Sequence, residues 1–167
     1  VGRGSSDWLA DAAGYVVPGY VADMVTLLAR LDAQVVDWVG TSMGGLIGMG
    51  LASLSNSPLR RLVLNDVGPA IEAAAIARIG SYVGQPAHWK TVEEAAAALR
   101  LISEGFGPHS DAQWLTLTLP QLKADGDGFA PHYDPAMAMA FKTLSPAMLQ
   151  AGEAMAWGAY GRISART

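Results

Sequence analysis

The 167-residue sequence contains no cysteine, only three lysines and no run of basic residues. The absence of cysteine excludes disulfide bonds, thiolate nucleophiles and cysteine-ligated metal sites. The formal net charge of −4 is opposite in sign to what a nucleic-acid groove or an anionic membrane surface attracts. No stretch approaches the roughly 20 apolar residues of a membrane span. We therefore expect no nucleic-acid or membrane partner and a cytoplasmic location.

Neither end of the sequence has the features of a natural terminus. The chain begins at Val1 in a Gly- and Ser-rich stretch, without an initiator methionine or a signal peptide. It ends at Thr167 without a polar tail after a folded element. We expect the sequence to be an internal part of a longer protein.

Hydrophobic residues make up 51% of the sequence, and their order along the first 69 residues is typical of an α/β protein. Helical spacing after Pro18 precedes a β-branched strand at 35–39 and a glycine-rich turn at 40–45. A helix at 46–54 and a second strand at 59–64 follow. This alternation with short connections predicts a parallel sheet with flanking helices, and we expect both strands to be buried.

Strand signals stop after Pro69, and we expect no strand between residues 70 and 158. Helices are predicted at 70–84, after Asp134-Pro135 and at 145–157, and a turn is predicted at 125–128. Two further helices are expected to begin at capping residues, which are Thr91 in a capping box, and Ser110 or Asp111. The span is therefore expected to be a helical block.

The turn at 40–45 places a serine between two glycines, Gly40-Thr41-Ser42-Met43-Gly44, in the pattern G-x-S-x-G. A nucleophile at a strand-to-helix turn has a strained backbone that exposes its hydroxyl. The residues two before and two after it approach each other, so both are expected to be small. The next helix directs its N–H groups and positive dipole end to the place where an oxyanion would form. The pattern in this context predicts Ser42 as a nucleophile.

Two other interpretations of the turn are kept as alternatives. Glycine-rich turns of this kind also bind dinucleotides when an acidic residue about 20 positions later holds the ribose, and Asp66 stands at that distance. A serine side chain at position 42 would obstruct the pyrophosphate, so we prefer the nucleophile. In the other alternative the serine is idle and the domain is non-catalytic.

Three segments of the sequence resemble successive landmarks of the α/β-hydrolase family. They are the loop at 3–7, which reads RGSSD, the turn at 39–45, and LVLNDVGP at 62–69. The resemblance is to esterase and lactonase-like members that carry a helical cap. It implies a partial α/β-hydrolase fold, in which parallel strands and flanking helices hold an inserted cap.

The resemblance also implies a division of the chain into three parts. Residues 1–68 would form part of the α/β core with the nucleophile elbow, and residues 69–158 the helical cap. Residues 159–167 would begin the next core strand.

By the same resemblance, Ser42 would attack the carbonyl of a small, apolar ester, lactone or related substrate. The backbone N–H of Met43 would hold the oxyanion, and the tight backbone of the elbow would depend on its glycines, Gly40, Gly44 and Gly45. The family's acid and histidine follow later strands, so we expect both outside this sequence and residues 1–167 alone to be inactive. We expect no cofactor and no metal ion, and the sequence assigns no oligomeric state.

Other titratable residues are weaker candidates. The histidines lie within the helical block, where the family's chain order does not place the base, and we interpret them as loop histidines: His88, His109 and His132. Some members of the fold take their acid from the strand after the elbow helix, where Asp66 lies. We keep Asp66 as a less favoured acid and prefer a loop-capping role beside Gly68.

Tryptophan and methionine enrich the helical block. If these side chains line a pocket, they favour an apolar substrate. Packing between helices is the simpler interpretation, and we assign most of them to the core. The set is Trp89, Trp114, Trp157, Met137, Met139, Met148 and Met155.

Overall fold

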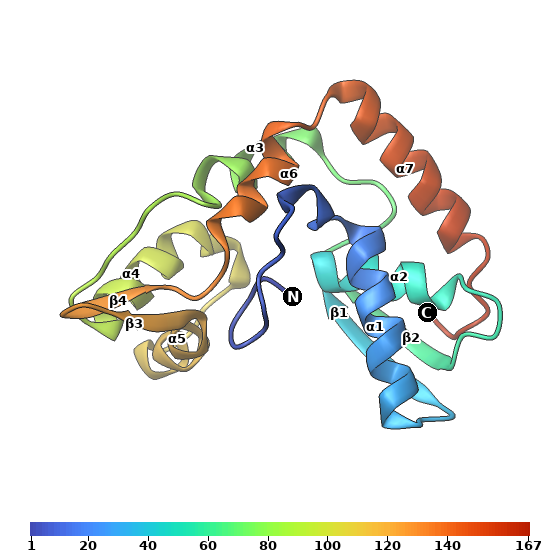
Figure 1. Ribbon diagram of the computed structural model, residues 1–167, viewed down its shortest axis with the longest axis horizontal. Coiled ribbons are helices and arrows are strands. Elements are labelled where there is room, and N and C mark those ends of the chain that lie inside the picture. Colours follow the sequence, from blue (N-terminus) through green and yellow to red (C-terminus); the bar gives the residue numbers. More distant parts are fainter. The chain divides into compact units, whose positions relative to one another are not determined.

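The fold is described from a computed structural model that covers residues 1–167. Figure 1 shows its helices and strands, which in chain order are α1 (Val17–Leu31), β1 (Val36–Thr41), α2 (Met43–Ala52), β2 (Leu59–Asn65), α3 (Ala73–Tyr82), α4 (Val92–Ile102), α5 (Asp111–Thr118), β3 (Leu122–Asp125), β4 (Gly128–Pro131), α6 (Ala138–Lys142) and α7 (Pro146–Tyr160). Short 3-10 helices lie at Ala12–Gly14, Glu104–Phe106, Leu119–Gln121 and Pro135–Met137.

Contacts divide the chain into two compact units, which interleave along the sequence. Unit 1 consists of Val1–Trp8 and Gly84–Ala136, and unit 2 consists of Leu9–Val83 and Met137–Thr167. Each unit is described by itself. The division into core, cap and next strand that the resemblance implies stays a prediction.

Unit 2 contains the parallel strand pair that the sequence predicted. β1 and β2 are paired in parallel, and Thr41 is the register partner of Asn65 at their carboxyl ends. On the other side of β2, the backbone of Arg166 forms a parallel bridge with Arg61. The N–H of Leu62 donates to the carbonyl of Arg166 at 2.9 Å. The last residues of the chain therefore lie along β2 as a further parallel strand would.

The core of unit 2 lies between α2 and one face of the strand pair. Met49 and Leu51 of α2 and Leu62 of β2 are each only 2% exposed. A Cβ at Gly48 would lie 2.7 Å from the indole ring of Trp38, so the helix approaches the sheet at a position without a side chain. A Cβ at Gly50 would meet Val21 of α1 at 2.7 Å, which shows that α1 packs closely on α2.

The other face of the strand pair corrects one expectation. Both strands were expected to be buried, but Val39 is 73% exposed and Val63 is 51% exposed. Side chains alternate between the two faces of a strand, and α2 covers only the face of Trp38 and Leu62. The prediction is therefore correct for the pairing and wrong for the burial of this second face.

Local capping signals place the helices of both units accurately. Oγ1 of Thr91 accepts the N–H of Glu94 at the start of α4, and Ser110 forms a complete capping box with Gln113 at the start of α5. The hydroxyl of Ser145 caps α7 by accepting the N–H of Met148. These side chains satisfy first-turn N–H groups that would otherwise lack a partner, which is why such residues mark helix starts.

The expectation of no strand between residues 70 and 158 was wrong. In unit 1, β3 and β4 form an antiparallel hairpin whose register pairs Leu122 with Pro131 and Asp125 with Gly128. Gly126 sits in the turn with φ of +56°, a conformation that suits glycine in a two-residue hairpin. Each strand has four residues and none is β-branched, so the strand pattern was too short and weak to recognise. The turn itself, at 125–128, was predicted correctly.

Candidate active site

The serine of the G-x-S-x-G pattern occupies the single residue between a strand and a helix. β1 ends at Thr41 and α2 begins at Met43, so the predicted strand, turn and helix are confirmed. Ser42 has φ of 50° and ψ of −120°. A non-glycine residue with positive φ is strained, and such residues are concentrated at functional sites.

The hydroxyl of Ser42 is exposed, whereas its backbone is fully engaged. The side chain makes no hydrogen bond to the chain, including none as a cap of α2. The N–H donates to the carbonyl of Asn65 at 3.0 Å, and the carbonyl accepts the N–H of Gly45 at 2.8 Å. The backbone is therefore held on both sides while the oxygen that would react is open to a substrate.

Glycine is required by space at positions 40 and 45. A Cβ at Gly40 would overlap the backbone carbonyl of Gly44 and the backbone nitrogen of Gly45. At Gly45 it would overlap Cγ1 of Val67. A Cβ at Gly44, by contrast, would meet no atom within 4 Å. The expectation that both glycines flanking the serine must be small was therefore correct for Gly40 and wrong for Gly44, because at Gly44 only the backbone makes the close approach.

The start of α2 is where the sequence predicted the donors for an oxyanion. Met43 is the first residue of the helix, and N–H groups at a helix start point toward the turn. Because the N–H of Ser42 is already bonded to Asn65, it is not available to a ligand in this arrangement. The role of Met43 as oxyanion donor stays a prediction.

Trp38 holds the start of α2 against β1. Its Nε1 donates to the carbonyl of Gly44 at 2.9 Å, and its ring lies beside Gly48.

We expect Trp38→Phe to lower the free energy of unfolding by about 1 kcal/mol, the typical contribution of one hydrogen bond. Urea unfolding of the purified protein measures this change. Trp157→Phe is the control, because that indole N–H makes no hydrogen bond; an equal loss in both variants would contradict the assignment.

Asp66, the less favoured acid, directly follows β2. It is exposed, has φ of +55°, and its carboxylate makes no hydrogen bond or ion pair. The preferred loop-capping role receives no support, because no such bond is formed. Asp66 lies at the same edge of the sheet as Ser42, since the carboxyl ends of β1 and β2 are register partners.

The three histidines all belong to unit 1, whereas Ser42 belongs to unit 2. The ring of His88 contacts the carbonyl of Asp125 at 3.0 Å, and that of His109 contacts the carbonyl of Gly107 at 3.0 Å. The contact of His109 is local, whereas that of His88 reaches a residue 37 positions later, and both histidines lie in loops as expected.

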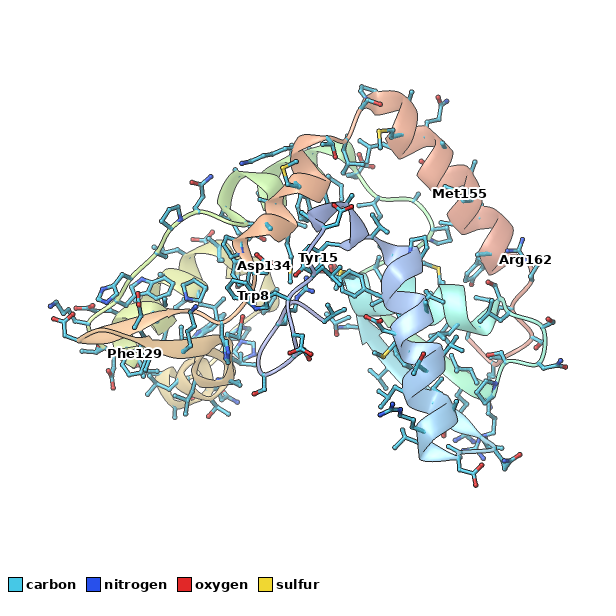
Figure 2. All side chains as sticks on the ribbon, in the orientation of Figure 1. Trp8, Tyr15, Phe129, Asp134, Met155 and Arg162 are labelled. Carbon is cyan, nitrogen blue, oxygen red and sulfur yellow. The ribbon has the colours of Figure 1, made fainter.

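The large apolar side chains of the helical block divide between core and surface. Trp114 and Met137 are buried, with 4% exposed in each case. Met155, which projects from α7 in Figure 2, is 71% exposed. Three other members of the set are also exposed, which are Trp157, Met139 and Met148. Assigning most of this set to the core was therefore wrong, because composition does not tell which face of a helix is covered.

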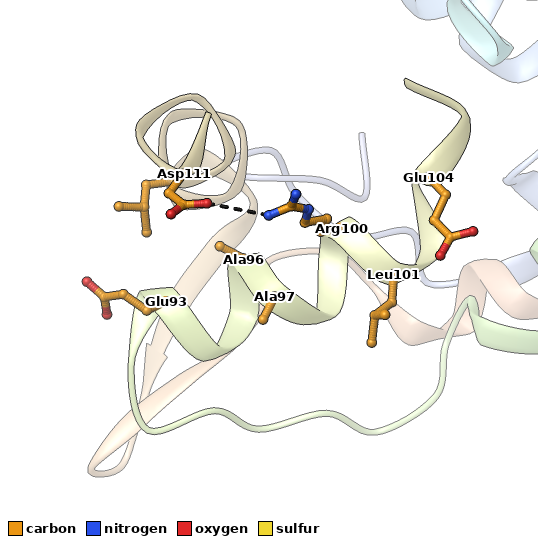
Figure 3. Close-up of a pocket in the computed structure, with 8 residues that line it drawn as sticks. Glu93, Ala96, Ala97, Arg100, Leu101, Glu104 and Asp111 are labelled. Atoms are coloured by element: carbon orange, nitrogen blue, oxygen red, sulfur yellow. Dashed lines mark hydrogen bonds and ion pairs between the residues drawn. The ribbon is translucent and has the colours of Figure 1, made fainter. Parts of the chain in front are cut away.

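Unit 1 contains an open cavity of about 510 Å³ that the sequence did not suggest. Figure 3 shows the residues of α4 and α5 that line it, which are alanine and leucine side chains together with charged side chains. Among these residues, Nη1 of Arg100 lies 3.4 Å from a carboxylate oxygen of Asp111. Its lining contains no serine, threonine or histidine, so it lacks the hydroxyl nucleophile and the imidazole base of the chemistry expected at Ser42.

β1 and β2 carry a charged pair at the end of the sheet opposite to Ser42. Asp37 and Arg60 sit near the amino ends of β1 and β2, and their side chains form a hydrogen-bonded ion pair. The Arg60 guanidinium lowers the pKa of the Asp37 carboxyl. At the Ser42 edge the strands carry no such pair, and no three His, Asp or Glu side chains of the chain are placed to hold a metal ion. The expectation that no metal or cofactor is needed stays a prediction.

None of the helices combines the length and apolarity needed to cross a membrane. The longest, α1 and α7, have 15 residues each. A helix of that length spans about 22 Å, which is less than the roughly 30 Å of a bilayer core.

No protein-family model matches the chain. The chain is 54% identical over 166 residues to a 3-hydroxybutyrate-oligomer hydrolase of Cupriavidus necator; the match covers 97% of this chain. Among solved structures it resembles an α/β hydrolase from Novosphingobium aromaticivorans, with 31% identity and a TM-score of 0.79 over 95% of the chain. The chain is therefore similar to α/β hydrolases over nearly its whole length, and its partial fold is theirs.

A second solved structure has the same fold over most of the chain. It is a putative hydrolase from Rickettsia typhi, 33% identical, with a TM-score of 0.77 over 83% of the chain. The chain spans 57% of the length of the curated relative, and 56% and 49% of the two solved chains. The partial α/β-hydrolase fold expected from the sequence is thereby confirmed.

Proposed function

We propose that the protein to which this chain belongs is a serine hydrolase that cleaves esters through Ser42. The observation that carries the proposal is the strained backbone of Ser42, with φ of 50° and an unbonded, exposed hydroxyl at the strand-to-helix turn. The identity of 54% to a hydrolase supports the same chemistry.

In the proposed reaction, Oγ of Ser42 forms a bond to the carbonyl carbon of the ester. A histidine outside residues 1–167 takes the hydroxyl proton, and an acid outside the chain orients that histidine. The N–H of Met43 and a second donor hold the oxyanion. The C–O bond to the alcohol then breaks, the histidine returns the proton to the alcohol, and water hydrolyses the acyl-serine. Residues 1–167 alone are therefore predicted to be inactive.

The substrates proposed for this reaction are short oligomers of 3-hydroxybutyrate, as the name of the C. necator relative indicates. Each is a chain of esters with small aliphatic units, which agrees with the small, apolar carbonyl substrate expected from the sequence. The same identity favours ester hydrolysis over the dinucleotide-binding alternative and over a non-catalytic domain.

The substrate proposal is tested by incubating the purified full-length protein with the dimer and the trimer of 3-hydroxybutyrate. We expect release of the monomer, together with hydrolysis of p-nitrophenyl butyrate at the same site. Cleavage of the p-nitrophenyl ester without cleavage of either oligomer would contradict the substrate. The dinucleotide alternative makes the opposite prediction: NAD raises the melting temperature and Ser42→Gly preserves that effect.

A further inference from the structure

The carboxyl ends of β1 and β2 are joined by one side chain, that of Asn65. Asn65 is the last residue of β2 and the register partner of Thr41, the last residue of β1. Its Nδ2 donates to Oγ1 of Thr41 at 3.1 Å. Its backbone carbonyl accepts the N–H of Ser42 at 3.0 Å. One residue therefore holds both the strand end and the strained serine that follows it.

The residue after each of these strand ends is strained in the same way. Ser42 has φ of 50° and Asp66 has φ of 55°. Such non-glycine conformations cost on the order of 1–3 kcal/mol and persist only when neighbouring interactions enforce them. One hydrogen bond of Asn65 holds the N–H of Ser42, and the other joins the residues that precede Ser42 and Asp66. The two bonds are thus placed to enforce the conformation of the turn.

The segment that follows β2 also packs against this turn. Val67 lies so close to Gly45 that a Cβ there would overlap its Cγ1. The first turn of α2 is therefore confined between the end of β1 and the segment after β2. Within this arrangement, the Asn65–Thr41 bond is the one interaction between side chains at the strand ends.

The Asn65–Thr41 bond has little to contribute to global stability. Both side chains are exposed, and water competes for an exposed hydrogen bond. Its effect falls instead on local geometry, where small displacements matter more. Catalytic groups need placement to within about 0.5 Å, and a displacement of 1 Å is able to cost about 100-fold in rate.

We propose that Asn65 is a positioning residue for catalysis by Ser42, acting through Thr41 and the backbone of the turn. This inference rests on the proposed function. Asn65 fixes the direction of the Ser42 hydroxyl relative to the first N–H groups of α2, without contact to the substrate. Its loss leaves substrate binding unchanged and slows the attack.

The test uses the whole protein and compares kcat and KM for p-nitrophenyl butyrate. Asn65→Ala and Thr41→Val are each expected to lower kcat about five- to tenfold, with KM and melting temperature little changed. The double variant is expected to be no slower than either single variant, because both remove the same bond. Thr41→Ser keeps the hydroxyl and is expected to retain the kcat of the wild type.

The rate of labelling by a fluorophosphonate separates failure of this inference from failure of the proposed function. If the wild-type protein is not labelled at Ser42, the proposed function falls. If it is labelled there and Asn65→Ala reacts and turns over at the wild-type rate, the positioning role is overturned. Losses that multiply in the double variant, or a Thr41→Ser variant as slow as Thr41→Val, also overturn it.

Discussion

Replacement of Ser42 by alanine is expected to lower kcat for ester hydrolysis by a factor of about 10⁴ to 10⁶. Losses of this size are typical when a serine hydrolase loses its nucleophile, because only oxyanion stabilisation and substrate binding remain. Labelling by a fluorophosphonate, mapped by mass spectrometry, is expected on Ser42 of the wild-type protein and on no serine of Ser42→Ala.

The structure predicts that this loss comes without unfolding. The hydroxyl of Ser42 makes no hydrogen bond, so its removal leaves no partner unsatisfied. Alanine at φ of 50° carries a strain similar to that of serine. Ser55→Ala is the matched control, because Ser55 is an exposed loop serine of the same unit. Turnover near wild type in Ser42→Ala, or an equal loss in Ser55→Ala, would contradict the nucleophile assignment.

The elements around Ser42 were predictable because their signals are local. The β-branched run before the turn placed β1 to within two residues, whereas the turn, expected at 40–45, is the single residue Ser42. The start of α2 was placed at Leu46, three residues late. Gly44 and Gly45 are poor helix formers, and their place in the first turn is set by contact with β1 rather than by propensity.

The burial of individual side chains was less predictable. Val39 and Met155 are apolar and occur in regular elements, yet both are more than 70% exposed. A periodic pattern gives the spacing of apolar residues but does not identify which face another element covers. Of the glycines in the turn, only the structure distinguishes Gly44, which has free space, from Gly40 and Gly45, which have none.

The position of Asn65 in the candidate site could not be derived from the sequence. It was recognisable only as part of a motif at the end of a strand. Its partner Thr41 lies 24 residues earlier, and their hydrogen bond depends on the register of two parallel strands. Register is fixed by packing across the sheet, which no local pattern in this sequence specifies.

Two alanine substitutions in the turn are expected to have opposite effects on stability. Gly40→Ala places a methyl group on backbone atoms of Gly44 and Gly45, which are unable to rotate away as a side chain would. Relief requires the first turn of α2 to move off β1. We expect a loss of about 3 kcal/mol or more, at the upper end of the usual cost of overpacking. Activity is expected to fall with it, because the displaced segment carries Ser42.

Gly44→Ala is expected to be neutral or to gain up to about 1 kcal/mol, since alanine has the higher helix propensity and its methyl group meets no atom within 4 Å. Gly152→Ala in α7 measures the propensity gain alone, because a Cβ there also has free space. Urea unfolding of the three variants gives the comparison. If Gly44→Ala is as destabilising as Gly40→Ala, both flanking glycines are required and the free space at Gly44 is wrong. If instead only Gly40→Ala is destabilised, the turn depends on one close backbone approach, and position 44 is open to larger side chains without loss of the fold.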